Sequence, residues 1–459
     1  MTNLSGANLN NGAAVGPQGE GRESPATFPV YPAYKDSGVE WLGEVPEYWS
    51  VTYISRLFEI KAGGDLKVDF FSDSQSEQHC FPIYTNAKSE SAVYGYTSKA
   101  IFPGDTITVT GRGDVGFAVY RDHPFDAIIR LLVLKPYKKM ATKYYSYLIN
   151  SLLSFSEGSS AINQLSTDQI SPYRVSLPPF IEQQKIVNFL DHETARIDAL
   201  IEVQQRLIEL LKEKRQAVIS HAVTKGLDPT VPMKDSGAEW LGEVPAHWDV
   251  LRIGAVYVEA GEKGLVELPV LRVSIHYGVS DKELTEEESD RKITRIDDRE
   301  KYKRVRPGDL VYNMMRAWQG GFGAVQVNGL VSPAYVVARP ISEDISRYVE
   351  QLLRTGCAVE EMRKNSYGIT DFRLRLYWDQ FKNIRIAVPP ESERQKIMLR
   401  IDSLISESDA LKNEADILIN ILQERRSALI SAAVTGKIDV RGWQPLTNAQ
   451  TTVLEAEVV

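Results

Sequence analysis

The feature that most constrains the fold is the stretch 178–226, in which apolar side chains recur every seven residues. This repeat is typical of a helix that pairs with another helix, because it keeps one apolar seam facing the partner. Pro178 and Pro179 stand before its first periodic residue and Gly226 follows its last, so both ends are signalled. The seam carries Leu190, Ile197, Gln204, Leu211 and Val218, its companion carries Ile186, Leu200 and Leu207, and the polar breaks are Glu193, Lys214 and His221. We predict a long helix over 181–225 that needs a partner.

The same chain supplies that partner, because residues 389–437 align with this stretch without a gap. Pro178 aligns with Pro389, which is an offset of 211. The second seam carries Ile401, Ala415, Leu422 and Leu429, and its companion carries Ile397, Leu404, Leu411 and Leu418. We expect helices 181–225 and 391–438 to pack along each other through Leu190, Ile197, Leu200, Leu207, Leu211, Ile401, Leu404, Leu411, Leu418 and Leu422.

A second repeated segment precedes each domain. KDSGVEWLGEVPEYWSVTYI (35–54) and KDSGAEWLGEVPAHWDVLRI (234–253) are identical at fourteen of twenty positions. Trp41 and Trp49 in the first copy match Trp240 and Trp248 in the second. Aromatic pairs in a Gly/Pro-rich segment usually clamp an irregular stretch onto a domain, and stacking on a nucleic-acid base is the alternative. The whole chain is therefore an internal duplication of clamp, domain and long helix.

Each domain is predicted to combine short β-runs with one helix, which makes the fold class α/β (α+β). The expected β-runs of the first domain are 51–60, 83–84, 92–96, 105–110, 117–120 and 127–134, followed by a helix at 143–154. Those of the second are 268–274, 310–314, 323–327 and 334–338, followed by a helix at 346–355. The predicted organisation is a disordered leader (1–30), domain 1 (31–180), helix 1 (181–225), a linker with the second clamp (226–245), domain 2 (246–390), helix 2 (391–438) and a tail (439–459).

Composition excludes several classes of function. The chain has 459 residues, 43% hydrophobic and 25% charged, with a net charge of −8 that by itself disfavours a nucleic-acid partner. Cys80 and Cys357 stand apart and the six histidines are scattered, so we expect no metal site. No long apolar run or secretion signal occurs, so we expect no membrane contact. Motifs for catalysis are absent, and we predict no catalytic residues.

One glycine-rich stretch could belong to a binding site. Residues 111–116, GRGDVG, fit the G-x-G-x-x-G pattern, but a dinucleotide site needs a helix after the loop and 117–120 has the composition of a strand. A glycine-rich hairpin is the simplest interpretation. The alternative is a loop that brings Arg112 to a phosphate or a guanine edge. At the matching place in the second copy, MRAWQGG puts Arg316 and Gln319 within reach of a groove.

Two further polar stretches stand at equivalent places, before the repeated pairs Asp168-Gln169 and Asp379-Gln380. They contribute Asn163 and Gln164 in the first copy and Asn365, Ser366 and Tyr367 in the second. Asn, Gln and Ser can pair with adenine edges or phosphates. Polar caps of loops are the alternative interpretation of both stretches.

The repeated motifs are similar to those of a known family. KDSGVEWLGEVPEYW, LPPFIEQQKIVNFLD and AVTKGLDPTVPMKDSGAEWLGEVPAHW, with their counterparts VPPESERQKI and LISAAVTGKID, resemble the DNA-specificity (S) subunit of type I restriction–modification systems over roughly residues 31–440. The resemblance implies two target-recognition domains joined by two long antiparallel coiled-coil helices with pseudo-twofold symmetry. It also implies a non-catalytic subunit that reads a bipartite DNA target.

The partners follow from the same resemblance. It implies double-stranded DNA, two modification (methyltransferase) subunits and restriction (translocase/nuclease) subunits, in a bacterial or archaeal cytoplasm. It implies no cofactor on this chain, with S-adenosylmethionine, ATP and Mg on the partner subunits. A coiled-coil scaffold without DNA binding is the alternative, which the acidic net charge favours and the two diverged domain interiors disfavour.

Overall fold

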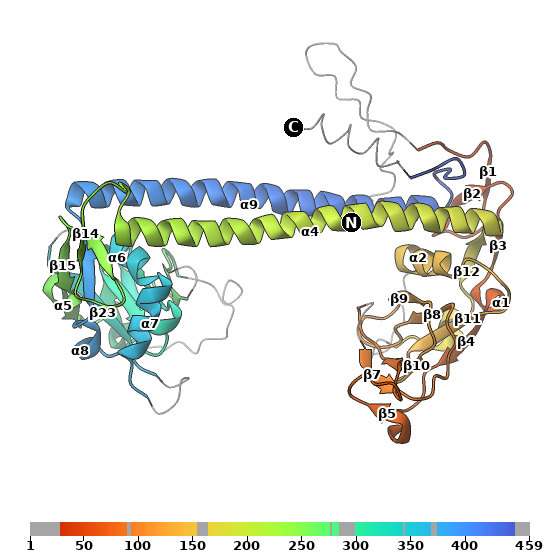
Figure 1. Ribbon diagram of the computed structural model, residues 1–459, viewed down its shortest axis with the longest axis horizontal. Helices are drawn as coiled ribbons and strands as arrows, with labels where there is room; N and C mark the ends of the chain where they lie inside the picture. The colour runs from red at the N-terminus through yellow and green to blue at the C-terminus, as the bar shows by residue number, and fades with distance from the viewer. Residues whose placement is uncertain are drawn as a thin grey trace, which may run out of the picture. The chain divides into compact units, whose positions relative to one another are not determined.

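The computed structural model describes residues 28–89, 93–153, 164–275, 278–283, 299–342, 345–368 and 374–445 (Figure 1). The chain divides into two compact units. The first unit contains Met1–Val203 and Ile417–Val459, and the second contains Gln204–Asp416. The two long helices, α4 (Phe180–Lys225) and α9 (Glu391–Val434), therefore contribute one part each to both units.

The first unit combines short strands with short helices. Its strands are β1 (Tyr34–Asp36), β2 (Glu44–Pro46), β3 (Ser50–Tyr53), β4 (Phe58–Ala62), β5 (Phe71–Ser72), β6 (Phe81–Tyr84), β7 (Val93–Thr97), β8 (Thr106–Val109), β9 (Ala118–Arg121), β10 (Asp126–Ala127), β11 (Leu132–Pro136) and β12 (Arg174–Leu177). Its helices besides α4 and α9 are α1 (Ile54–Leu57), η1 (Val68–Phe70), α2 (Thr142–Leu152) and α3 (Thr167–Ile170). They form sheets of order β4-β11-β8-β9 and β10-β6-β7-β5, with the pairs β1-β2 and β12-β3.

The second unit has a similar inventory. Its strands are β13 (Met233–Asp235), β14 (Glu243–Pro245), β15 (Asp249–Arg252), β16 (Tyr257–Ala260), β17 (Val273–Ser274), β18 (Gly278–Val279), β19 (Lys303–Val305), β20 (Leu310–Asn313), β21 (Phe322–Ala324), β22 (Gly329–Val331), β23 (Tyr335–Pro340) and β24 (Arg385–Val388). Its helices are α5 (Ile253–Val256), η2 (Arg299–Lys301), η3 (Ala317–Gln319), α6 (Ser346–Leu353), α7 (Gly356–Lys364) and α8 (Trp378–Phe381). The main sheet has the order β16-β23-β20-β21, with the pairs β13-β14, β15-β24, β17-β18 and β19-β22.

The two main sheets share one topology. The order β4-β11-β8-β9 is repeated as β16-β23-β20-β21, and all neighbours are antiparallel. The register is also repeated, since Phe58 faces Pro136 in one unit and Tyr257 faces Pro340 in the other. The predicted mixed fold class and the internal duplication are therefore confirmed.

The main sheet separates two cores, as the strand β20 shows in the second unit. Its side chains alternate in direction, so Leu310 and Tyr312 join the large core that α6 covers. Val311 points to the opposite face and joins a small core with Val331 and Val337. Because both faces are buried, the strand has the continuous apolar sequence that a half-exposed strand would lack.

Each domain core is closed by the end of the long helix from the other copy. In the first unit, the Tyr144 hydroxyl on α2 donates to the carbonyl of Val434 at the end of α9, at 2.8 Å. In the second, the Tyr348 hydroxyl on α6 donates to the carbonyl of Val223 at the end of α4, also at 2.8 Å. Val434 and Val223 are fully buried and are equivalent under the offset of 211. The core of each domain is therefore complete only with the end of the long helix from the other copy.

An ion pair between α4 and α9 recurs in each unit with its partners exchanged. Asp198 of α4 pairs with Arg426 of α9 at 2.8 Å in the first unit, and Arg215 of α4 pairs with Asp409 of α9 at 2.9 Å in the second. The offset of 211 relates the two aspartates and the two arginines. Such exposed pairs contribute only about 0–1 kcal/mol each. These ion pairs show that α4 and α9 are antiparallel within each unit and have the same register in both units.

Half of the predicted helix contacts lie on the buried seam. Leu190, Ile197 and Ile401 are 0%, 6% and 1% exposed, which is the burial that their predicted packing role requires. Leu404 and Leu422 are also buried, at 9% and 8% exposed. Leu211 is only half-buried.

Away from the helix starts, the companion seam was predicted one residue out of phase, although its members Ile186, Ile397 and Leu404 are buried. Leu200 and Leu207 are 51% and 41% exposed on α4, and Leu411 and Leu418 are 48% and 40% exposed on α9, so their predicted packing role is wrong. On α4 the companion positions follow the seam by four residues instead of three, and they are Thr194, Ile201 and Ile208. Spacings of three and four both fit a heptad, and the polar Thr194 concealed the correct one.

The tryptophan clamps are buried anchors. Trp49 and Trp248 are completely buried. The glycines that end α9 and α4 pack against them, since a Cβ at Gly436 would lie 3.0 Å from Trp49 and one at Gly226 would lie 3.4 Å from Trp248. Both glycines have a positive φ, which is the usual conformation just after a helix. The clamp prediction is confirmed, and burial excludes base stacking by these two indoles.

Two predicted β-runs are interrupted, and two predicted tails contribute to the core. The helix α1 divides the run 51–60, and left-handed residues at 129 and 130 divide 127–134. Phe28 and Trp443 both pack edge-on against Phe189, with ring centroids 5.1 and 5.3 Å away. Sequence reasoning assigned Phe28 to the leader and Trp443 to the tail because isolated aromatics carry no period.

The heptad phase predicts which helix residues matter for stability. We expect Ile197→Ala to lower the free energy of unfolding by about 2–4 kcal/mol, because it leaves a cavity at a buried position. Leu200→Ala, three residues later, should cost less than about 1 kcal/mol. Urea unfolding of the two variants checks this, and equal losses would contradict the observed phase.

Candidate nucleic-acid interface

Three loops of the first unit meet at the side chain of Asn86, which follows β6. Its Oδ1 accepts the backbone N–H groups of Gly111 and Arg112 at 2.6 and 3.3 Å. Its Nδ2 donates to the carbonyl of Ile129 at 2.7 Å. One amide side chain therefore fixes the loops that follow β6, β8 and β10.

The loop after β10 has an unusual backbone. Ile129 and Arg130 have φ values of 56° and 58°, which side chains other than glycine rarely adopt. Backbone bonds hold them there, since the N–H groups of Ile129 and Arg130 donate to Gly64 and Gly63. A Cβ at Gly63 would lie 2.5 Å from the carbonyl oxygen of Ala127, so only glycine allows this approach. The exposed Arg130 side chain is thus presented from a constrained backbone.

The glycine-rich stretch is a hairpin between β8 and β9, as the simplest interpretation predicted. A strand follows the loop, so the dinucleotide alternative is wrong. Arg112 is exposed and forms an isolated bridge with Gln164, which brings two predicted residues together. Asn163 lies outside the described residues. A Cβ at Gly111 would lie 2.9 Å from the carbonyl oxygen of Arg130, so Arg112 and Arg130 stand on adjacent loops.

The corresponding loop of the second unit runs from the end of β20 through η3. Its neck is closed by the N–H of Asn313, which donates to Gly321 at 2.8 Å. Arg316 and Gln319 lie on this loop as predicted, and Gln319 is exposed. The Arg316 and Arg272 cations oppose the burial that raises the pKa of Tyr335, so Arg316 lies near that ring.

The guanidinium of Arg354 plays the part that Asn86 plays in the first unit. It donates to the carbonyls of Ile275 and Phe322 at 3.0 and 2.9 Å. Glu350 holds it from the other side at 3.1 Å. The guanidinium joins the segment after β17 to β21, beside the loop that carries Arg316. Each of its three nitrogens has a protein partner, so its role is to position that loop.

The stretch 365–367 behaves differently from its prediction. The Asn365 side chain donates to the carbonyl and carboxylate of Glu361 at the end of α7. Ser366 is 9% exposed and its hydroxyl donates to Met362, at odds with a predicted DNA contact. The alternative of a polar cap describes both residues. Tyr367, which is 64% exposed, is the one predicted residue here that faces solvent.

Two arginines belong to these surfaces although no motif marked them. Arg375 pairs with Tyr367 through two backbone hydrogen bonds, and Leu376 then donates to Met314 in the Arg316 loop. Arg130 was concealed inside a predicted β-run. Two adjacent residues in the left-handed conformation leave no recognisable pattern in a single sequence. An arginine close in the chain to a tyrosine, as Arg375 is to Tyr367, is a pattern that could have been noticed.

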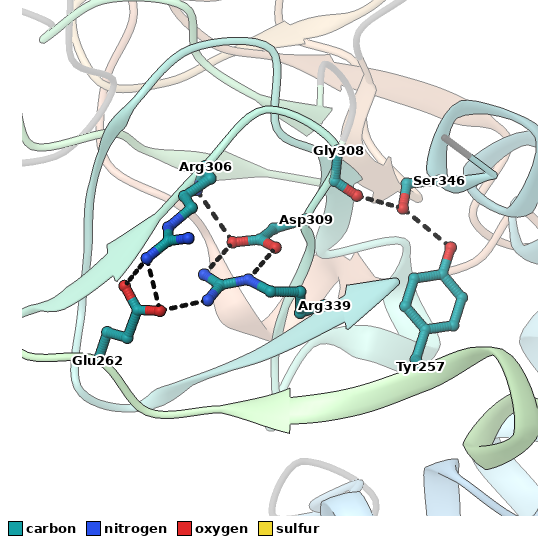
Figure 2. A network of polar contacts seen from close by, with 7 residues as sticks. All are labelled: Tyr257, Glu262, Arg306, Gly308, Asp309, Arg339 and Ser346. Atoms are coloured by element: carbon teal, nitrogen blue, oxygen red, sulfur yellow. Dashed lines mark hydrogen bonds and ion pairs between the residues drawn. The ribbon is translucent and has the colours of Figure 1, made fainter. Parts of the chain in front are cut away.

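A buried polar network supports the turn that opens β20 (Figure 2). Asp309, which is 1% exposed, receives both Nε and Nη2 of Arg339 at 2.9 Å. Glu262 bridges Arg339 and Arg306, and the Arg339 hydrogen bond is the main cause that lowers the pKa of Glu262. The matching Asp105 of the first unit is exposed and has a φ of 55°. One Pro-Gly-Asp motif therefore forms two different turns.

The described residues contain neither a candidate metal cluster nor a helix suited to crossing a membrane. No cluster of His, Cys, Asp or Glu there could hold a metal ion. Within the same residues, no helix has the length and apolarity to cross a membrane.

Comparison with known proteins agrees with the fold. Residues 46–212 match the family model of the type I restriction modification DNA specificity domain. The EcoKI type I specificity subunit of Escherichia coli K12 is 21% identical, over 88% of this chain and 91% of the relative. A type I specificity subunit proposed in Mycoplasma pneumoniae is 25% identical, over 37% of this chain but only 49% of that relative.

A solved structure has the same fold. It comes from work on complex assembly and conformational transition of the type I R-M system, and it matches 86% of this chain and 99% of its own with a TM-score of 0.60 at 14% identity. The family model and the relatives agree that this chain is similar to type I restriction–modification specificity subunits.

The buried network predicts an asymmetry between two arginines. We expect Arg339→Leu to destabilise the protein by about 3–5 kcal/mol, because it leaves Asp309 charged and buried without its main partner. Arg306→Leu should cost about 1 kcal/mol or less, since its ion pair is exposed. Urea unfolding at neutral pH compares them, and similar losses would show that Asp309 does not depend on Arg339.

Proposed function

We propose that this chain is the specificity subunit that reads a bipartite duplex DNA target, with one half-site for each domain. The proposal rests on the observation that both units contain a main sheet of the same topology, while the loops held beside the two sheets differ. In the first unit these loops present Arg112 and Arg130, and in the second they lead to Arg316, Tyr367 and Arg375. Domains with a common frame and different loops suit the reading of two different half-sites.

The chemistry of these side chains suits a duplex. An arginine guanidinium can donate two parallel hydrogen bonds to the O6 and N7 acceptors of guanine, or bind a phosphate. Discrimination between bases requires that the side chain start from a constrained backbone, since a mobile one loses free energy on binding. The Asn86 and Arg354 contacts supply that constraint. Gln164 and Gln319 could add amide contacts to adenine.

The long helices are proposed to set the gap between the half-sites. α4 and α9 each run without a break from a domain of one copy to the domain of the other. An α-helix has a fixed rise of 1.5 Å per residue, so the length of α4 and α9 would act as a ruler for the distance between the two half-sites. Dimer geometry fixes half-site spacing in symmetric DNA-binding proteins in the same way.

The proposal includes partner subunits that carry out the chemistry. Two methyltransferase subunits that use S-adenosylmethionine would dock on the equivalent surfaces of the duplicated clamps, and restriction subunits that use ATP and Mg would join them in the cytoplasm. The names of the relatives and the duplication support this assignment. The chain itself would direct these activities to the target and perform none of them.

The direct test is DNA binding as a function of salt, with the full chain alone and with a methyltransferase partner. We expect a gel shift of duplex DNA that weakens linearly on a logarithmic salt scale, since binding releases counterions from phosphates. Absence of binding under both conditions would favour the scaffold alternative.

Arg112 provides the first residue-level prediction. Arg112→Ala should weaken binding of the target duplex by about 1–3 kcal/mol if it reads a base edge, and should lower the salt slope by about 1 if it binds a phosphate. Lys99→Ala, an exposed change in the same unit, is the matched control. Fluorescence anisotropy at several salt concentrations checks this, and unchanged affinity together with an unchanged slope would remove Arg112 from the interface.

The ruler makes a second prediction. Deletion of one heptad from both α4 and α9 shortens each by about 10 Å at 1.5 Å per residue, so we expect the gap in the target to shorten by about three base pairs. Methylation-aware sequencing of DNA modified by the variant complex measures the gap. An unaltered gap would show that the helices do not set it.

A further inference from the structure

A cleft of about 500 Å³ lies in the first unit where α4 begins. Its floor is apolar and includes Leu57, Met140 and Phe180. Tyr48 and Tyr137, which are 48% and 60% exposed, stand at its rim. This volume is within the range of sites that hold a small ligand or a side chain of a partner.

Three cations line the same cleft, and they are Arg56, Lys138 and Lys139. Within the residues that the structure describes, none of the three forms an ion pair with a carboxylate. Two of them lie over aromatic rings. Arg56 is 5.4 Å from the ring centroid of Tyr53, and Lys139 is 5.9 Å from that of Phe180. The start of the 46-residue helix α4 adds a partial positive charge. The local field therefore favours an anion.

A carboxylate that contacts the rim residue Tyr48 is already engaged. Glu182 is 5% exposed and accepts hydrogen bonds from the hydroxyls of Tyr31 and Tyr48, the latter at 2.9 Å. Burial and this carboxylate raise the pKa of Tyr48 to about 12, so the phenol stays protonated and remains a hydrogen-bond donor to Glu182. Glu182 thus orients a rim tyrosine, and among the described residues it forms no ion pair with any of the three cations.

The combination selects the chemical class of the ligand. Protruding cations are sufficient to bind the phosphates of a duplex, and such binding does not require an apolar floor. An acidic peptide with one apolar side chain would satisfy both features, because its carboxylates can pair with the cations while the side chain fills the cleft. We propose that this cleft binds an acidic, apolar-anchored peptide segment of a partner protein.

The second copy has lost the same site. Ala255 stands at the position of Arg56 and Ser342 at that of Lys138, since the N–H groups of Ile341 and Tyr137 make equivalent bonds to the carbonyls of Val256 and Leu57. Glu391 replaces Phe180 at the start of the long helix, so the apolar floor becomes acidic. The site therefore occurs once in a duplicated chain. The proposed peptide site is a function separate from DNA reading. It makes the two halves of the chain different, whereas they otherwise offer equivalent surfaces.

The test uses the full chain and a fluorescein-labelled peptide of alternating glutamate and glycine with one central phenylalanine. We expect one peptide to bind per chain, and Lys138→Glu to weaken binding about tenfold or more through repulsion. Lys99→Glu, an exposed charge reversal in the same unit, should leave the affinity unchanged. A matching peptide with lysine for glutamate should not bind. Circular dichroism of both variants verifies that they are folded.

A gain-of-site variant tests the same idea from the other half. Ala255→Arg/Ser342→Lys/Glu391→Phe changes three exposed positions and should add a second peptide per chain. Parent-like affinity of Lys138→Glu, two peptides bound by the parent chain, or a loss of duplex DNA binding in place of peptide binding would each overturn the proposal. Peptide and DNA titrations are independent, so failure here is distinguishable from failure of the Arg112 prediction.

Discussion

Burial of the end of each long helix in the domain of the other copy is the interaction on which the structure depends. Val223 and Val434 are fully buried at these junctions, and each accepts a tyrosine hydrogen bond. An apolar side chain buried in this way contributes about 1.5–3 kcal/mol. Because the helix that closes a domain comes from the other copy, neither half of the chain has a complete core alone. The antiparallel register of α4 and α9 within each unit follows from this exchange.

The loops beside the main sheets obtain their rigidity from different sources in the two units. In the first, the neutral amide of Asn86 satisfies backbone groups of two other loops. In the second, the charged Arg354 does so while Glu350 balances its charge. Both devices satisfy backbone groups that would otherwise lose hydrogen bonds on burial. This explains how the interiors can diverge while the frame stays constant, which is what the reading of two unlike half-sites requires.

Pseudo-symmetry is strict where the copies close each other's cores and is lost elsewhere. The exchanged pairs Asp198–Arg426 and Arg215–Asp409 keep one register. In contrast, Asp309 is buried in an arginine network while its counterpart Asp105 is exposed. The basic cleft is a further difference of this kind. A duplicated frame can therefore support equivalent docking on both halves and a distinct contact on one.

The sequence by itself determined the duplication, the two long helices and the tryptophan clamps, because repeated motifs and heptads are local in the chain. It also led to the prediction that Arg112 and Arg316, which follow recognisable turns, belong to the binding surface. The tertiary structure alone decided that Ile208 and not Leu207 is buried, since two heptad spacings fit the same residues. It alone brought Arg130 beside Arg112, because only long-range backbone bonds to Gly63 and Gly64 hold residue 130 in a left-handed conformation. Contacts between loops depend on the packing of the strands that carry them, and no local pattern encodes that packing.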